Sequence, residues 1–167
     1  MSWDEFLSFF PEVELPVSVT EELINSAEAV NKVFPPVAIA EYISVWEREA
    51  EFDEFTEFVP ILCIIQPDDF FAVIYWKGGL MSYEYVLVTL DKEGSLISRR
   101  VIASTISDGK TIKRAVAKID EDLIIHIMAG AHLIDEKYDP AHSKPYSMEI
   151  MQTGNIIFSL EEDGWIS

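Results

Sequence analysis

Cysteine, basic residues and long apolar runs are all scarce in this sequence of 167 residues. Cys63, the only cysteine, excludes an internal disulfide, and we interpret it as a small apolar side chain within the run Ile61–Ile65. The 12 basic residues face 30 acidic ones, and this net charge of −18 argues against binding of nucleic acid or an anionic membrane. No apolar run approaches the roughly 18 residues of a membrane span, and acids follow Met1 where a signal peptide carries bases. We expect a soluble cytoplasmic protein.

Apolar side chains are plentiful at 49% of the chain, and they are enough to form a folded core. A chain of this length corresponds to one ordinary domain, which should bury roughly 70% of the surface that its unfolded form exposes. We therefore expect a single domain over residues 1–167, with a helical layer in 1–50 and an antiparallel sheet in 55–163.

The N-terminal third has the apolar spacing of helices. Ser2 and Glu5 form an S-x-x-E capping box, and the apolar stripe that follows ends at Pro11. The same signals predict a second helix that begins at 18–21 and a third that begins at Pro36. Three helices are therefore expected ahead of the sheet.

From about Phe55 the apolar period changes toward two residues, and turn residues such as Gly78–Gly79 recur between the apolar runs. This pattern predicts eight strands, at roughly 55–66, 70–77, 80–90, 95–103, 111–119, 123–131, 145–152 and 156–162. Short links make sequential strands neighbours in the sheet. The strand at 123–131 lacks alternation, so we expect it to be central or covered on both faces, with the helices as its cover. The predicted fold class is α+β, with the N-terminal helices packed on a curved or barrel-like antiparallel β-meander of about eight strands.

Three stretches carry a family resemblance: 85–98, 117–126 and the closing hairpin 146–158. Together with the extended element Phe10–Pro16, they resemble a group of small uncharacterised bacterial proteins that open with a Phe-Pro-x-x-x-Leu-Pro element. The resemblance implies an antiparallel, β-rich fold. It supplies no catalytic residues.

Charge is strongly segregated along the chain. Residues 1–57 hold 14 acidic and two basic residues, whereas half of the 12 basic residues lie in 99–118. The basic segment is either a solvated strand face that meets acids of the helical layer or a site for an anionic ligand. The candidate ligand-binding residues combine these bases with aromatic side chains that could line a pocket between helices and sheet: Arg99, Arg100, Lys113, Arg114, Trp76 and Tyr85.

Adjacent bases within this segment must point to opposite faces of their strand, as Arg99 and Arg100 do. An inward-facing guanidinium needs a carboxylate or a bound anion, because an unpaired buried charge costs several kcal/mol. Lys113 and Arg114 pose the same problem on a later strand. We expect at least one of these four side chains to contact an acid of the helical layer or an anion, the acid being the favoured partner.

A loop with two histidines is the best candidate for metal or acid–base chemistry. His132, Asp135 and His142 could ligate a divalent cation, although their spacing matches no established ligand motif such as H-E-x-x-H. The alternative is an ordinary polar loop. A P-loop, a G-x-G-x-x-G motif and a G-x-S-x-G elbow are all missing, so we expect no cofactor.

Three function classes remain open. The favoured one is a non-enzymatic binding or protein-interaction domain, such as an acidic inhibitor or immunity-type partner of a basic protein, which would dock on the acidic and aromatic run Glu47–Glu57. The second is a binder of a small anionic ligand, with its pocket between helices and sheet. The third is an enzyme that pairs His126, His132 or His142 with a nearby aspartate. The sequence leaves the oligomeric state open.

Overall fold

The computed structural model describes residues 1–47, 53–136 and 143–159. Its helices are α1 (Trp3–Leu7), α2 (Leu23–Val30), α3 (Pro36–Ala38), the π-helical turn η1 (Ile39–Ile43) and α4 (Ser44–Trp46), the last three in one continuous run. Its strands are β1 (Glu12–Val13), β2 (Val17–Val19), β3 (Glu57–Ile64), β4 (Phe71–Gly78), β5 (Ser82–Leu90), β6 (Leu96–Ser107), β7 (Thr111–Ile119), β8 (Ile124–Leu133), β9 (Lys144–Ile150) and β10 (Ile156–Phe158).

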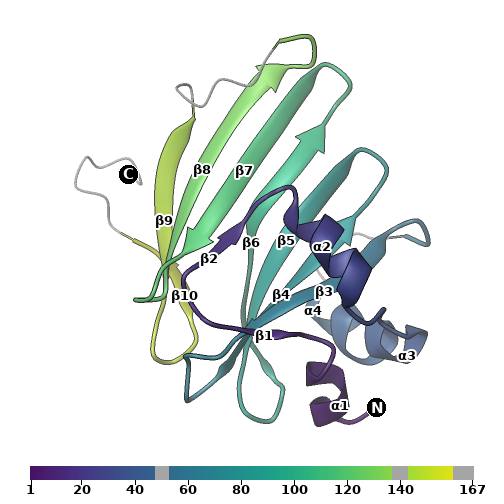
Figure 1. The fold of residues 1–167 in the computed structure, drawn as a ribbon, viewed down its shortest axis with the longest axis vertical. Coiled ribbons are helices and arrows are strands. Elements are labelled where there is room, and N and C mark those ends of the chain that lie inside the picture. The colour runs from purple at the N-terminus through teal and green to yellow at the C-terminus, as the bar shows by residue number, and fades with distance from the viewer. Residues whose placement is uncertain (48–52, 137–142, 160–167) are drawn as a thin grey trace.

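All ten strands belong to one sheet, in the order β1-β3-β4-β5-β6-β7-β8-β9-β10, and β2 pairs with β7 beside this path (Figure 1). The β1–β3 pair is parallel and every other pair is antiparallel. The sheet curves until β10 reaches β6, where the Ile156 amide donates to Ser98 Oγ at 3.4 Å and Arg100 Nη2 donates to the Ile156 carbonyl at 3.2 Å. No ladder joins β10 to β6 in the described part of the chain, so the sheet does not close into a barrel.

The α+β class and the eight predicted strands are confirmed, whereas the barrel-like alternative is wrong. The last predicted strand ends at Phe158, and 160–162 lie outside the described residues. The N-terminal part is less helical than expected, because the extended Pro11–Pro16 segment contains β1 and leads directly into β2. Ser18 lies in β2 rather than capping a helix, and α2 begins at Leu23 without a side-chain cap. Ser2 does cap α1, since its Oγ accepts from the Glu5 amide at 3.1 Å.

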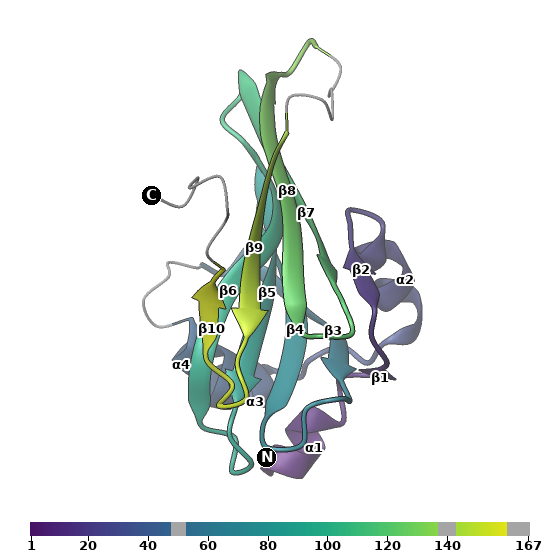
Figure 2. The same ribbon diagram turned by 90° about the vertical axis from the view of Figure 1, so that its left-hand side faces the viewer.

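Strands β4 and β5 are buried on both faces, and alternate side chains enter two separate cores. Ile74 and Leu87 belong to the first core, which α2 and β2 cover; Val73 and Val88 belong to the second, which α1 and the α3–α4 run cover. Figure 2 shows α2 and α4 on opposite sides of these strands. The helices therefore pack on β3–β5 and not on the strand predicted at 123–131. That strand, β8, is central but has an open outer face, where Met128 is 38% exposed.

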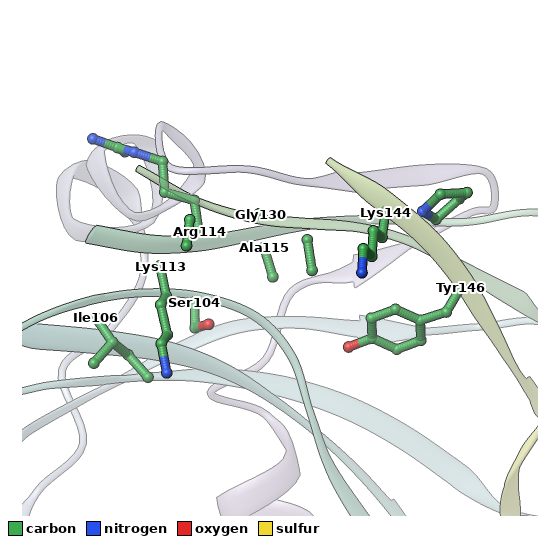
Figure 3. A pocket seen from close by; sticks show the side chains of 11 residues that line it. Ser104, Ile106, Lys113, Arg114, Ala115, Gly130, Lys144 and Tyr146 are labelled. Carbon is green, nitrogen blue, oxygen red and sulfur yellow. The ribbon is translucent and has the colours of Figure 1, made fainter. Parts of the chain in front are cut away.

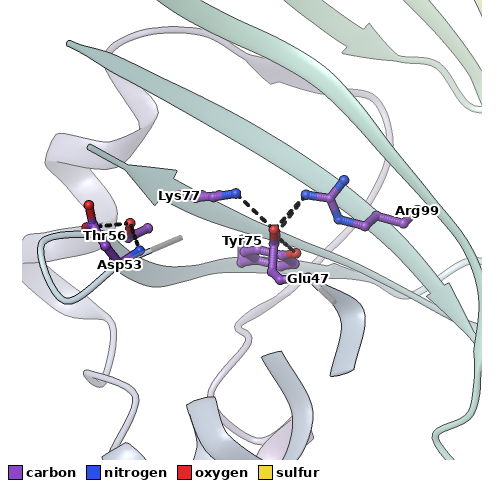
Figure 4. A network of polar contacts seen from close by, with 6 residues as sticks. All are labelled: Glu47, Asp53, Thr56, Tyr75, Lys77 and Arg99. Carbon is purple, nitrogen blue, oxygen red and sulfur yellow. Dashed lines mark hydrogen bonds and ion pairs between the residues drawn. The ribbon is translucent and has the colours of Figure 1, made fainter. Parts of the chain in front are cut away.

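A buried carboxylate joins the second helical layer to the sheet. Glu47 follows α4, its side chain is 0% exposed, and it accepts hydrogen bonds from Tyr75 Oη at 2.5 Å, Lys77 Nζ at 3.0 Å and Arg99 Nη2 at 2.8 Å (Figure 4). The expectation that a base of the 99–118 segment contacts an acid of the helical layer is thereby confirmed for Arg99. This contact joins the end of the helical run to β4, through Tyr75 and Lys77, and to β6, through Arg99, the two strands on either side of β5.

Opposing effects set the protonation of this cluster. Burial by itself raises the pKa of the Glu47 carboxyl, but the hydrogen bonds from Tyr75, Arg99 and Lys77 outweigh it and hold the pKa below its ordinary value. Burial and the neighbouring Glu47 charge raise the pKa of Tyr75, so its phenol stays protonated and donates. Glu47 is therefore ionised and fully paired in the folded protein.

We predict that Glu47→Gln lowers the free energy of unfolding at neutral pH by about 3–5 kcal/mol, because it leaves two half-buried cations without their counter-charge. A carboxyl whose pKa falls on folding stabilises the protein above its unfolded pKa, ordinarily 4.5, and this stabilisation is lost as the pH falls through the folded pKa. The difference between parent and variant should therefore shrink below a pH of about 4.5. Urea unfolding of both proteins at several pH values measures this difference in the free energy of unfolding.

The control is Glu28→Gln, which removes one negative charge from an exposed position of α2. This variant should unfold like the parent at every pH. An equal loss of stability in both variants, or a Glu47→Gln loss that does not vary with pH, contradicts the assignment.

Candidate functional site

The inward faces of β6, β7, β8 and β9 change character along their length. Toward one end they carry large buried side chains, including Ile119, Ile125, Ile127 and Met148. Toward the other end, the same faces of β7 and β8 carry the small residues Ala115, Ala129 and Ala131. Because small side chains leave the space above them unfilled, the sheet forms a groove of about 900 Å³ there.

Larger side chains, most of them polar, surround the floor of alanines in this groove. Lys113 projects from β7, Lys144 and Tyr146 from β9, and Ser104 and Ile106 from β6 (Figure 3). Arg114, Gly130 and Pro145 complete the lining. Cross-strand pairing fixes the arrangement: Ser104 lies opposite Ala115, Ala115 opposite Ala129, and Ala129 opposite Lys144.

The groove is electropositive within a very acidic protein. Lys113 and Lys144 are both exposed, and no described acid lies within ion-pair distance of either side chain. Asp108 is the acid whose charge Lys113 influences, but Asp108 Oδ1 already accepts from the Thr111 and Lys110 amides at 2.7 and 2.9 Å. These hydrogen bonds, with a smaller contribution from Lys113, lower the pKa of Asp108. Two ammonium groups are thus available to a ligand.

Tyr146 gives the groove an aromatic wall. Its ring lies 6.2 Å from that of Phe158, and its hydroxyl points into the groove (Figure 3). Burial raises the pKa of the phenol, so it stays protonated at neutral pH and can donate a hydrogen bond. An anion with an apolar part would find donors, methyl groups and a ring in one place.

The structure disperses the predicted ligand-binding residues. Arg99 is held by Glu47, and Arg100 donates to the Arg99 and Ile156 carbonyls at 2.9 and 3.2 Å. Arg114 points away from Lys113 and forms an ion pair with Glu21, just before α2. Of the four bases, only Lys113 projects into the groove.

The aromatic candidates lie under α2 instead of in this groove. Tyr85 is 0% exposed, and its hydroxyl accepts from the Ile24 amide at 2.9 Å. Trp76 is opposite Tyr85 on β4, where it packs against the first core. Neither Trp76 nor Tyr85 is among the residues that line the groove between β6 and β9.

The proposed metal ligands fall partly outside the described residues, since His142 lies there. His132 uses both ring nitrogens: Nδ1 is 2.8 Å from the Leu133 carbonyl, and Nε2 accepts from Arg114 Nε at 3.3 Å. Among the residues that the structure describes, no group of three histidine, cysteine or acidic side chains could hold a metal ion. Asp135 remains a metal ligand only as a prediction.

One histidine does pair with an aspartate. His126 Nε2 lies 2.8 Å from Asp120 Oδ2, on the outer face of the sheet, where the His126 side chain is 54% exposed. Lys118 lies opposite His126 on β7 and is exposed as well. This pair does not line the groove, and no histidine within the described residues is among its lining side chains.

A second cavity, of about 600 Å³, lies beside α1 and is lined by Cys63, Phe71 and Lys92 among others. Lys92 Nζ sits 4.4 Å from the centre of the Phe71 ring, and the acids Asp4 and Glu12 line the same cavity. Burial raises the pKa of the Cys63 thiol to about 11, so it stays protonated. The interpretation of Cys63 as a small apolar side chain is confirmed.

Sequence reasoning missed Lys144, Tyr146 and Ser104. The available signal was the run Ala129–Ala131 in β8, where small residues replace the bulky ones that precede them on the same face. This run indicates a groove only because Ala115 lies opposite Ala129, and a single sequence does not show that pairing.

We predict that Ala129→Leu leaves the free energy of unfolding within about 1 kcal/mol of the parent, because the added side chain enters empty space. Ile127→Ala, two residues earlier on the same face, should cost about 2–5 kcal/mol, because Ile127 is only 1% exposed and its loss leaves a cavity. Urea unfolding of both variants compares the two positions. A loss at Ala129 as large as that at Ile127 would show that the groove is already filled.

No helix in the described part of the chain is long and apolar enough to cross a lipid bilayer. No protein-family model, curated protein or solved structure matches the chain, so the groove's own geometry carries the functional argument.

Proposed function

We propose that this chain is a non-enzymatic binding protein that holds a small anionic organic ligand in the groove between β6 and β9. The observation that carries the proposal is the placement of Lys113 and Lys144 around a floor of alanines, with no described acid paired to either lysine. The groove's volume of about 900 Å³ lies within the range of small-molecule sites.

The whole-molecule charge makes the groove selective. A net charge of −18 repels anions at long range, so weak, non-specific anion binding is disfavoured. A ligand that reaches the groove gains short charge-assisted hydrogen bonds, each contributing about 1.5–3 kcal/mol. Burial of its apolar part against the alanine methyl groups and the Tyr146 ring adds to this. Ligands with both an anionic and an apolar part are favoured over simple inorganic anions.

A second candidate function is the docking of a basic protein on the acidic N-terminal part. Every described acid before Glu47 is exposed: Asp4, Glu5, Glu12, Glu14, Glu21, Glu22, Glu28 and Glu41. The run Glu47–Glu57 supports this less well than its sequence indicates, because Glu47 is buried and 48–52 lie outside the described residues. Charge reversal at Glu22 and Glu28 should weaken a salt-sensitive complex of this kind, while groove variants leave it unchanged.

Fluorescence titration with anilinonaphthalene sulfonate, an anion with apolar rings, tests the groove. We predict saturable binding to the parent and at least a tenfold weaker dissociation constant, equivalent to about 1.4 kcal/mol, for Lys113→Glu and for Lys144→Glu. Ala129→Leu should also weaken binding, because it fills the groove without changing the charge. High salt should weaken binding to the parent.

Lys118→Glu is the matched control. It makes the same charge change on the same strand as Lys113→Glu, but Lys118 is exposed on the opposite face of β7. Equal losses of probe affinity in the three glutamate variants would mean that the probe senses only net charge. An unchanged probe affinity in the Ala129→Leu variant would mean that the probe binds outside the groove. Thermal unfolding of each variant confirms that the probe reports on the folded protein.

A further inference from the structure

The donors of the groove fall into two separate groups. Lys113 and Ser104 lie together at the β6–β7 side, and Lys144 lies with Tyr146 at the β9 side (Figure 3). Between the two groups, the cross-strand row passes through Ala115 and Ala129 alone. The groove therefore presents a cation and a hydroxyl at each end and methyl groups in the middle.

Sheet geometry sets the separation of the two groups. Lys113 on β7 and Lys144 on β9 are separated by one strand, β8. Along the strand direction they are offset by two residues, since Lys113 is opposite Ala131 and Lys144 is opposite Ala129. Strand spacing and rise per residue then place the two lysine backbones roughly 12 Å apart. A compact anion at one end would leave the other ammonium without a partner. A ligand that satisfies both must be elongated.

We propose that the ligand is an elongated dianion with an apolar middle, of the class of α,ω-dicarboxylates. One carboxylate accepts from Lys113 and the Ser104 hydroxyl, and the other accepts from Lys144 beside the Tyr146 ring. The methylene chain between them covers Ala115 and Ala129 and removes their methyl groups from water. This inference rests on the proposed function, and it specifies in addition how many negative charges the ligand carries and how far apart they lie.

Isothermal titration calorimetry with two matched series of ligands tests the inference on the whole chain of 167 residues. The first series is succinate, adipate, suberate and sebacate; the second is the saturated monocarboxylates of equal carbon number. We expect the affinity of the dicarboxylates to pass through a maximum with chain length. At that length the dicarboxylate should bind at least tenfold more tightly than its monocarboxylate, because it engages both lysines.

Neutralising one lysine at a time separates the two ends. Lys113→Gln and Lys144→Gln should each reduce the affinity for the best dicarboxylate to the level of the matching monocarboxylate. Lys118→Gln, which removes the same charge from the opposite face of β7, should leave it unchanged. These three positions are exposed, so the variants should fold, and thermal unfolding verifies this.

Two outcomes overturn the inference and leave the proposed function intact, provided that anilinonaphthalene sulfonate still binds and still depends on the lysines. In the first, dicarboxylates bind no better than monocarboxylates at any length, or neither series binds. In the second, dicarboxylate binding survives in the Lys113→Gln, Lys144→Gln double variant. If the fluorescent probe also fails to bind the parent protein, both the inference and the proposed function are wrong.

Discussion

Burial of both faces of β4 and β5 is the constraint on which the rest of the structure depends. Apolar side chains alternate into two cores, with Ile74 and Leu87 in one and Val73 and Val88 in the other, so neither face can be left to water. The N-terminal segment supplies both covers, because α1 and the α3–α4 run lie on one side and α2 with β2 on the other. The Glu47 cluster then holds the second cover to β4 and β6, the two strands on either side of β5.

The same arrangement explains why a groove exists. All of the described helices pack at the β3–β5 side, so the outer half of the sheet must fill its own concave face with strand side chains (Figure 1). Ile119, Ile125 and Met148 do so at one end. Alanines at the other end do not, and the space above them is bordered by Lys113 and Lys144. The site is thus a place where core packing stops, and its chemistry comes from the side chains at that boundary.

Local signals in the sequence predicted the strands well, because turn chemistry and alternation act over a few residues. Gly94 and Gly154, for example, adopt φ near +91° in tight turns that the sequence indicates. These local signals do not reveal which distant strands pair. Nothing in the sequence near Ser18 shows that it pairs with Lys118. Lys144 lines the groove only because it lies opposite Ala129. The burial of Glu47 was equally hidden, since its three partners come from distant strands.

The pairing of β2 with β7 has a consequence for synthesis of the chain on the ribosome. Val17 pairs with Ile119 and Val19 with Ala117, so the second strand to be made has no partner until about a hundred further residues have emerged. The β3–β4 and β4–β5 hairpins, by contrast, can form their antiparallel pairs as soon as both strands of each hairpin have been made. During synthesis β2 therefore stays unpaired while the hairpins assemble, and the first core is complete only after β7 to β10 have emerged.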